Sequence, residues 1–159
     1  MRRLRSSRRC CPNSLGLLIF LSDFGSVELF KEVFQRARPC YFLKGVRVAY
    51  KKEEVICVFQ PHRISRLKDL RKEFSFSFQD ANTVVLCPIY TAGEKIKLGF
   101  NYLNFAKELI KNSKVKLFLV DDKYQLAKYI KNNIYGKKIV IGMGAGSISA
   151  WMRELPKLL

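Results

Sequence analysis

Short apolar runs alternate with longer amphipathic segments from residue 46 to the end of the chain. The apolar runs lie at 55–59 (VICVF), 83–90 (TVVLCPIY), 115–120 (VKLFLV) and 137–143 (KKIVIGM). Runs with so little polar alternation are typical of strands that are buried on both faces of a parallel sheet. We therefore predict four strands in these segments, and we expect Pro88 to end the second.

The segments that follow the four strands have the spacing of amphipathic helices. Their apolar residues recur every three or four positions, so that these residues share one helical face. Helices are predicted at 64–78, 102–112, 123–134 and 147–159. Asn101 stands where an N-cap is expected for the second helix, and Asp121 or Asp122 stands there for the third.

Strand and helix thus alternate four times, which is the pattern of an α/β fold. We expect a Rossmann-like, mostly parallel sheet with helices on both faces. Residues 1–45 do not continue this pattern. The segment 27–34 (VELFKEVF) has the length of two helical turns, and Arg38–Pro39 is expected to interrupt the chain beyond it.

The composition changes near the same place. Residues 1–45 hold seven Arg and two Lys, whereas residues 46–159 hold five Arg and sixteen Lys. Residues 1–42 are therefore interpreted as an unrelated or frame-shifted segment, and residues 43–159 as the α/β domain. The start of the chain is basic and then apolar at 15–21, as in a secretory signal or transit peptide, but no small-residue cleavage site comes after it.

The net charge of +17 is high and is compatible with an anionic partner. Nucleic acid, a phosphorylated small molecule and a membrane surface would all fit. No run of about 18 apolar residues occurs, so no membrane span is predicted. The five cysteines show no metal-ligand or disulfide spacing, which is typical of a reducing compartment. Cys57 and Cys87 lie within strands and are interpreted as small buried apolar residues.

Three loops follow the carboxyl ends of predicted strands, where open parallel sheets bind their ligands. They read QPHRISR (60–66), IYTAGE (89–94) and GMGAGS (142–147). The first holds His62, the one histidine of the chain, beside Arg63 and Arg66.

Two guanidinium groups can bind a carboxylate or phosphate in a bidentate way, and imidazole can donate or accept a proton near neutral pH. If a helix begins near Ile64, its free N–H groups also favour an anion. The alternative is an ordinary loop histidine beside two surface arginines, and the chemistry alone does not decide between them.

The second loop contains two candidate binding residues, Tyr90 and Glu94. Glu94 could hold an ammonium group, a basic side chain or a metal ion, or it could be a solvated loop carboxylate. The third loop imitates a dinucleotide fingerprint, but its third glycine comes one position early. We expect close packing of helix against strand to explain these glycines, with an oxidoreductase as the weaker alternative. No phosphate-binding loop of the ATPase kind occurs in the sequence.

Taken together, VFQPHRISRLKDL (58–70), IYTAGE (89–94) and GAGSI (144–148) resemble the carboxyl-terminal domain of the Mur ligase family, in its alanine-adding members. The order and spacing of the motifs fit, and the resemblance covers about residues 43–159. It implies a cytoplasmic ligase of peptidoglycan synthesis, and hence a role in the cell wall, cell shape and cell division.

The resemblance also implies the chemistry. A full-length family member uses ATP and Mg²⁺ to activate the carboxylate of UDP-N-acetylmuramate, which the amino group of L-alanine then attacks. Its terminal domain closes over the active site and helps to place the amino acid. The positions that match His62, Arg63 and Arg66 face the amino-acid and acyl-carboxylate region. The resemblance assigns substrate binding to these residues together with Tyr90 and Glu94, and no catalytic residue or metal ligand.

Two departures from the family qualify this interpretation. No ATPase domain is present, and the family's Asp-Tyr-x-His-His-Pro segment is replaced by VFQRARPCYF (33–42). We therefore expect a substrate-positioning fragment that is inactive alone and that needs a separate chain with the missing domains. The alternative is a basic α/β module that binds nucleic acid or phosphorylated ligands.

Overall fold

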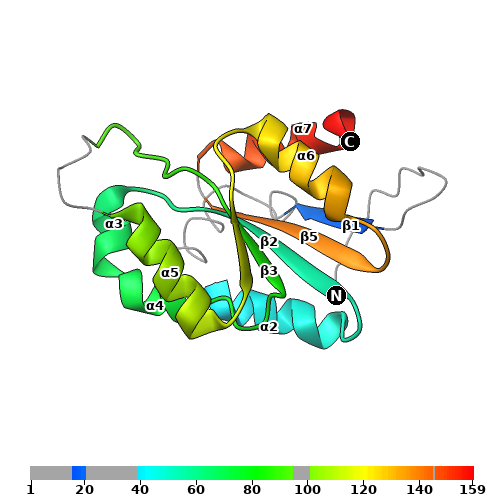
Figure 1. Ribbon diagram of the computed structural model, residues 1–159, viewed down its shortest axis with the longest axis horizontal. Helices are drawn as coiled ribbons and strands as arrows, with labels where there is room; N and C mark the ends of the chain where they lie inside the picture. The colour runs from blue at the N-terminus through cyan, green and yellow to red at the C-terminus, as the bar shows by residue number, and fades with distance from the viewer. Residues whose placement is uncertain (1–15, 21–38, 95–100, 145) are drawn as a thin grey trace, which may run out of the picture.

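The computed structural model describes residues 16–20, 39–94, 101–144 and 146–159. Five strands and six helices lie in these residues (Figure 1). The strands are β1 (Gly16–Phe20), β2 (Glu54–Gln60), β3 (Thr83–Leu86), β4 (Lys116–Leu119) and β5 (Lys138–Gly144). The helices are α2 (Pro39–Ala49), α3 (Ile64–Asp69), α4 (Arg71–Phe76), α5 (Tyr102–Ser113), α6 (Lys123–Asn133) and α7 (Ile148–Leu158).

The five strands form one parallel sheet in the order β1-β5-β2-β3-β4. The central strand β2 pairs with β5 from Glu54–Lys138 to Gln60–Gly144 and with β3 from Ile56–Thr83 to Phe59–Leu86. All six residues from Val55 to Gln60 are buried, as the continuous apolar run predicts. The α/β fold with a parallel sheet is therefore confirmed.

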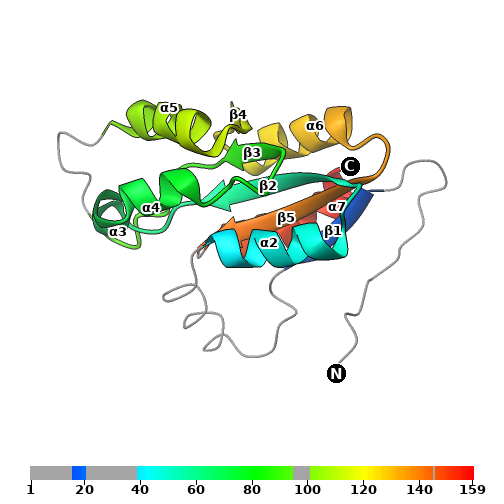
Figure 2. The same ribbon diagram turned by 90° about the horizontal axis from the view of Figure 1, so that it is seen from below.

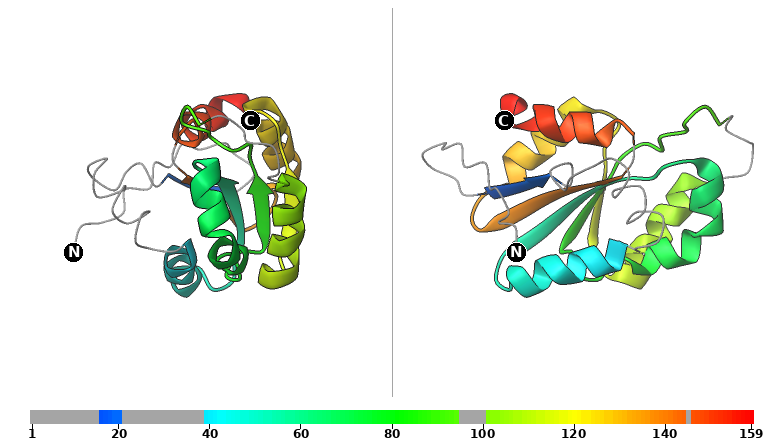
Figure 3. Two further views of the ribbon diagram at one scale, coloured as in Figure 1. Left: turned by 90° about the vertical axis from the view of Figure 1, so that its left-hand side faces the viewer. Right: turned by 180° about the vertical axis from the view of Figure 1, so that it is seen from behind.

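Helices cover both faces of the sheet, as expected (Figures 2 and 3). One apolar core joins the sheet to α2, α3, α4 and α5, and it includes Leu43, Leu67, Phe78 and Leu109. The other joins the opposite face to α6 and α7, through Leu126, Ile130 and Met152. Successive β2 residues alternate between the two cores, with Cys57 in the first and Val58 in the second. This alternation follows from the period of two along a strand.

Two predicted elements differ in extent from the structure. The helix expected over 64–78 is two short helices, because Leu70 leaves the helical conformation with φ −106° and ψ 18°. Both Leu67 and Phe74 still reach the core. The strand expected over 83–90 ends at Leu86, and the chain then continues as a loop. The cap predictions were right: the side chain of Asn101 accepts from the Asn104 N–H, and Asp122 caps α6.

Residues 1–45 do not continue the alternating pattern, yet two elements within or overlapping this segment belong to the fold. β1 pairs with β5 from Gly16–Lys138 to Phe20–Gly142 and becomes an edge strand of the sheet. The helix α2, which was not predicted, begins at Pro39, a residue suited to the first helical position, and this start is compatible with the break expected at Arg38–Pro39. This helix spans residue 42, the proposed segment boundary. The predicted helical turns at 27–34 and the cysteines Cys10 and Cys11 lie outside the described residues.

Arg47 fastens the end of α2 to the amino-terminal edge of the sheet. Its guanidinium donates to the backbone oxygens of Glu53 (2.8 Å) and Asp80 (2.9 Å), and to Oδ1 of Asn82 (2.7 Å). The same Oδ1 accepts from the Val55 N–H at 2.8 Å. One side chain therefore holds α2, the start of β2 and the turn before β3 together.

Replacing Arg47 with alanine is expected to lower the free energy of unfolding by about 1.5–3 kcal/mol, because charge-assisted hydrogen bonds to three acceptors are lost. Urea unfolding measures the change. Lys44→Ala is the control on the same helix, since Lys44 is exposed, and should change stability by less than about 0.5 kcal/mol. Equal effects of the two variants would show that Arg47 does not fasten the helix.

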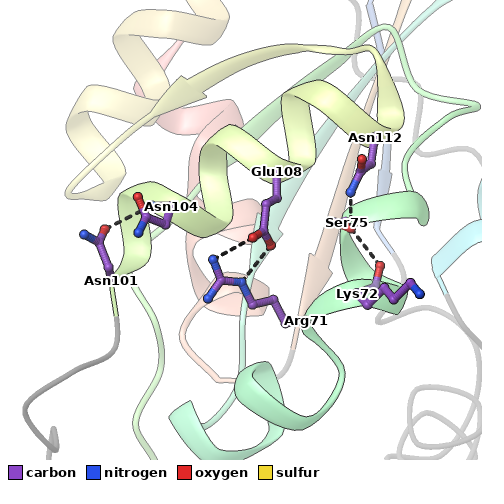
Figure 4. A network of polar contacts seen from close by, with 7 residues as sticks. All are labelled: Arg71, Lys72, Ser75, Asn101, Asn104, Glu108 and Asn112. Atoms are coloured by element: carbon purple, nitrogen blue, oxygen red, sulfur yellow. Dashed lines mark hydrogen bonds and ion pairs between the residues drawn. The ribbon is translucent and has the colours of Figure 1, made fainter.

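Polar contacts also hold α4 against α5, on the same face of the sheet as α2 (Figure 4). Arg71 forms a bidentate ion pair with Glu108, at 2.7 and 2.8 Å. Asn112 donates to the Ser75 hydroxyl at 2.8 Å, and this hydroxyl donates to the Lys72 carbonyl oxygen at 2.7 Å. Because the Arg71–Glu108 pair is partly exposed, it contributes at most about 1 kcal/mol. Packing of the buried faces of α4 and α5 in the apolar core therefore contributes most of the free energy that holds the two helices together.

Candidate functional site

The three loops singled out in the sequence meet at the carboxyl edge of the sheet. Beyond the ends of β2 and β3, His62 and Tyr90 form an isolated parallel bridge. The Tyr90 N–H donates to the Pro61 oxygen at 2.9 Å, and the Arg63 N–H donates to the Tyr90 oxygen at 2.8 Å. The first and second loops are thereby held in register, although neither continues its strand.

The imidazole of His62 stacks on the ring of Tyr90, with centroids 5.5 Å apart and planes inclined by 20°. Partial burial, together with the positive charges of Arg63 and Arg66, lowers the pKa of His62, while Glu94 opposes this shift. Its neutral form therefore predominates at pH 7. A neutral imidazole can donate one hydrogen bond and accept another but adds no positive charge to the site.

Arg63 precedes the first turn of α3, and Arg66 lies within that turn. Arg63 is exposed and has φ 61°, a left-handed conformation that is uncommon for a residue with a side chain. Arg66 is half-buried, and burial lowers its pKa from the usual value. An arginine stays charged under these conditions. The site thus holds two fixed positive charges near the stacked rings.

Glu94 caps α3 from the neighbouring loop. Its Oε2 accepts from the N–H groups of Ile64 (2.9 Å) and Ser65 (3.1 Å), and its Oε1 accepts from the Ser65 hydroxyl at 2.6 Å. The expectation of free N–H groups at this helix start was therefore wrong for these two residues. Hydrogen bonds from Ser65 and Ile64, with the charge of Arg63, lower the pKa of Glu94.

Gln60 joins all three loops, and the sequence analysis did not single it out. Its buried carboxamide donates to the Pro88 oxygen at 3.3 Å and to the Ser147 hydroxyl at 2.9 Å. Its Oε1 accepts from the Ile148 N–H at 2.9 Å and so caps α7. The available signal was its position at the end of a buried strand, because a buried amide has to find partners.

The glycines of the third loop fit tight packing, as the sequence analysis expected. A Cβ atom on Gly142 would lie 2.5 Å from the Met152 side chain of α7. A Cβ atom on Gly146 would lie 2.4 Å from the ring of Tyr90. Each of these positions therefore faces protein atoms, and Gly146 brings the third loop against the second.

Among the described residues, neither a metal-binding group nor a reactive buried thiol forms a second candidate site. Among them, no group of three or more His, Cys, Asp and Glu side chains could hold a metal ion. Burial raises the pKa of Cys57, and it raises the pKa of Cys87 to about 12, so both thiols stay protonated and unreactive at neutral pH. No helix among the described residues is long and apolar enough to cross a membrane.

The chain is similar in sequence to known proteins. No protein-family model matches the chain. The chain is 76% identical to the UDP-N-acetylmuramate–L-alanine ligase of Pelagibacter ubique (strain HTCC1062) over 117 residues, which are 74% of this chain and 25% of that protein. The chain spans about a quarter of the length of the curated relatives that it matches.

Solved structures show the same fold at low sequence identity. The UDP-N-acetylmuramate–alanine ligase of Thermotoga maritima matches with a TM-score of 0.56 and 21% identity, over 75% of this chain and 23% of that one. The murein peptide ligase of Psychrobacter arcticus 273-4 matches with a TM-score of 0.60 and 10% identity, over 76% of this chain and 24% of that one. These solved structures show that the fold is shared. The curated relatives show that the carboxyl-terminal region of the chain belongs to the Mur ligase family.

Proposed function

We propose that residues 43–159 form the substrate-positioning, carboxyl-terminal domain of a UDP-N-acetylmuramate–L-alanine ligase. The observation that carries the proposal is the 76% identity to such a ligase over 117 residues. The gathering of His62, Arg63, Arg66, Tyr90 and Glu94 at one edge of the sheet supports it.

The charge of this cluster suits a single carboxylate. Arg63 and Arg66 each carry one positive charge and Glu94 carries one negative charge, while His62 is mainly neutral. One net positive charge remains, which matches a carboxylate better than a polyanion. In the proposed role the two guanidiniums hold a substrate carboxylate, and the stacked pair of His62 and Tyr90 forms a wall beside it. The contribution of such groups is to orient the reactants.

In the proposed ligase, ATP and Mg²⁺ would be bound outside the residues that the structure describes. The described residues form no metal-binding group, and the sequence contains no phosphate-binding loop of the ATPase kind. The described residues alone therefore do not fit these groups, and we assign these residues no step of the acyl activation. UDP-N-acetylmuramate and L-alanine are the proposed substrates of the full-length enzyme.

A chimeric enzyme tests this proposal. Residues 43–159 would replace the matching terminal part of the Pelagibacter ubique ligase, and ATP-dependent addition of L-alanine would be measured. We expect an active chimera, in which Arg63→Ala or Arg66→Ala lowers kcat/KM roughly 10²-fold because the carboxylate is misplaced. Arg153→Ala, at an exposed position on α7, is the control and should keep full activity.

Two results would contradict the proposal. The first is a folded chimera without activity, and the second is an active chimera that tolerates the loss of both arginines. The alternative, a basic module for nucleic acid, rests on the net charge of +17. It would be favoured if the full chain bound nucleic acid with an affinity that falls about 10³–10⁵-fold between 50 and 200 mM salt, whether or not Arg63 and Arg66 are present.

A further inference from the structure

The carboxylate of Glu94 is already bound within the chain. Three hydrogen bonds reach it from Ile64 and Ser65, at 2.9, 3.1 and 2.6 Å. Because both carboxylate oxygens already accept hydrogen bonds, a direct contact with a substrate ammonium group would compete with the hydrogen bonds from Ile64 and Ser65 at the start of α3. Glu94 lies in the loop after β3, about 30 residues along the chain from α3, so it connects two separate loops of the site.

The backbone around Arg63 needs such a connection. Arg63 adopts φ 61°, which costs free energy in a residue with a side chain and persists only where neighbouring contacts hold it. Its own N–H donates to the Tyr90 oxygen at 2.8 Å, and its oxygen accepts from the Leu67 N–H at 3.2 Å. The next two N–H groups, of Ile64 and Ser65, are held by Glu94. The second loop therefore fixes the chain on both sides of the Arg63 Cα atom.

The α3 helix provides little stability of its own. It contains six residues, has no acidic residue in its first turn, and receives no cap from the side chain of Arg63. A helix of this length is not stable in isolation. Arg66 lies in its first turn, so the direction of that guanidinium depends on how the turn is held.

We propose that Glu94 is a positioning residue, whose carboxylate fixes the start of α3 so that Arg63 and Arg66 act on one carboxylate of the substrate. It does not contact the substrate itself. This assignment rests on the proposed function, in which the two arginines bind that carboxylate. It replaces the open choice between an ammonium ligand, a metal ligand and a solvated side chain with one role.

The first experiment measures amide hydrogen exchange by NMR in the full chain. Glu94→Ala should reduce protection of the Ile64 and Ser65 amides about tenfold, because each loses its acceptor. Glu94→Gln should restore part of this protection, since an amide oxygen can still accept. Glu154→Ala removes a carboxylate that pairs with Lys123 elsewhere on the surface, and it should leave both amides unchanged. Unchanged amides in Glu94→Ala would overturn the proposal.

The second experiment titrates the full chain with N-acetylmuramate, which carries one carboxylate, and follows the NMR signals of the Arg63 and Arg66 side chains. Glu94→Ala should weaken binding about tenfold, and Glu94→Gln should recover part of it. In the Arg63→Ala/Arg66→Ala background, Glu94→Ala should weaken binding no further, because Glu94 acts through these two arginines.

The outcomes separate the two proposals. If Glu94→Ala weakens binding further when Arg63 and Arg66 are both alanine, Glu94 contacts the ligand directly and the positioning role is wrong. If Glu94→Ala lowers amide protection but leaves binding unchanged, the carboxylate has a structural role only and the proposal is again wrong. If the wild-type arginine signals do not respond to N-acetylmuramate, the proposed function fails, and the positioning role fails with it even where the amides respond.

Discussion

Replacing Gly144 with alanine is expected to lower the free energy of unfolding by about 2–5 kcal/mol, from steric overlap and backbone strain together. Gly144 is the last residue of β5 and pairs with Gln60 of β2. An added Cβ atom would lie 2.5 Å from the Gln60 backbone oxygen and 3.1 Å from the Ile148 side chain. Because the first of these atoms belongs to the central strand, it cannot move without opening the sheet. The φ angle of +150° at Gly144 also disfavours alanine.

Gly45→Ala is the matched control for this variant. Gly45 lies within α2, and a Cβ atom there would have no neighbour within 4 Å. Alanine should therefore stabilise the helix, by about 0.5–1 kcal/mol. Urea unfolding of both variants measures the contrast. If Gly144→Ala were as stable as Gly45→Ala, the close approach of the third loop to β2 would not exist in solution.

The regular part of the fold was predictable because its signals are local. An apolar run such as 55–59 specifies a strand buried on both faces, and a residue such as Asn101 specifies a helix start without reference to distant parts of the chain. The edge strand β1 was missed because its place in the sheet depends on pairing with β5, more than a hundred residues away. The helix α2 was missed because the alternating pattern was recognised only from residue 46, although proline is tolerated in the first turn of a helix.

The candidate site was predictable in its location and less so in its contacts. Parallel topology alone brings the three loops to one edge, and the structure places His62, Arg63 and Tyr90 together there. The partners of Glu94 and Gln60 could not be predicted, because they depend on the paths of loops that are 29 to 88 residues apart. A helix start that binds an anion was expected at Ile64, and in the structure the carboxylate of Glu94 accepts the hydrogen bond from the Ile64 N–H.

The Gln60 side chain hydrogen-bonds Pro88, which precedes the second loop, as well as Ser147 and Ile148 at the third loop. Gln60→Met keeps a side chain of similar length but removes both the donor and the acceptor. The Pro88 oxygen, the Ser147 hydroxyl and the Ile148 N–H then lose a buried partner. We expect the free energy of unfolding to fall by about 2–4 kcal/mol, because the groups left unpaired keep their desolvation cost. Gln79→Met, at an exposed position, should change it by less than about 0.5 kcal/mol.

The same variant separates stability from the geometry of the site. Loss of the contact with Pro88 releases the segment that leads to Tyr90, and loss of the Ile148 cap releases the start of α7 beside Gly146. The NMR signals of the Tyr90 and His62 rings should therefore shift in Gln60→Met well below its unfolding midpoint and stay unchanged in Gln79→Met. A fully stable Gln60→Met with unchanged ring signals would show that strand pairing alone brings the loops together. A destabilised variant with shifted rings would show that this buried amide both supports the sheet edge and places the candidate binding residues on it.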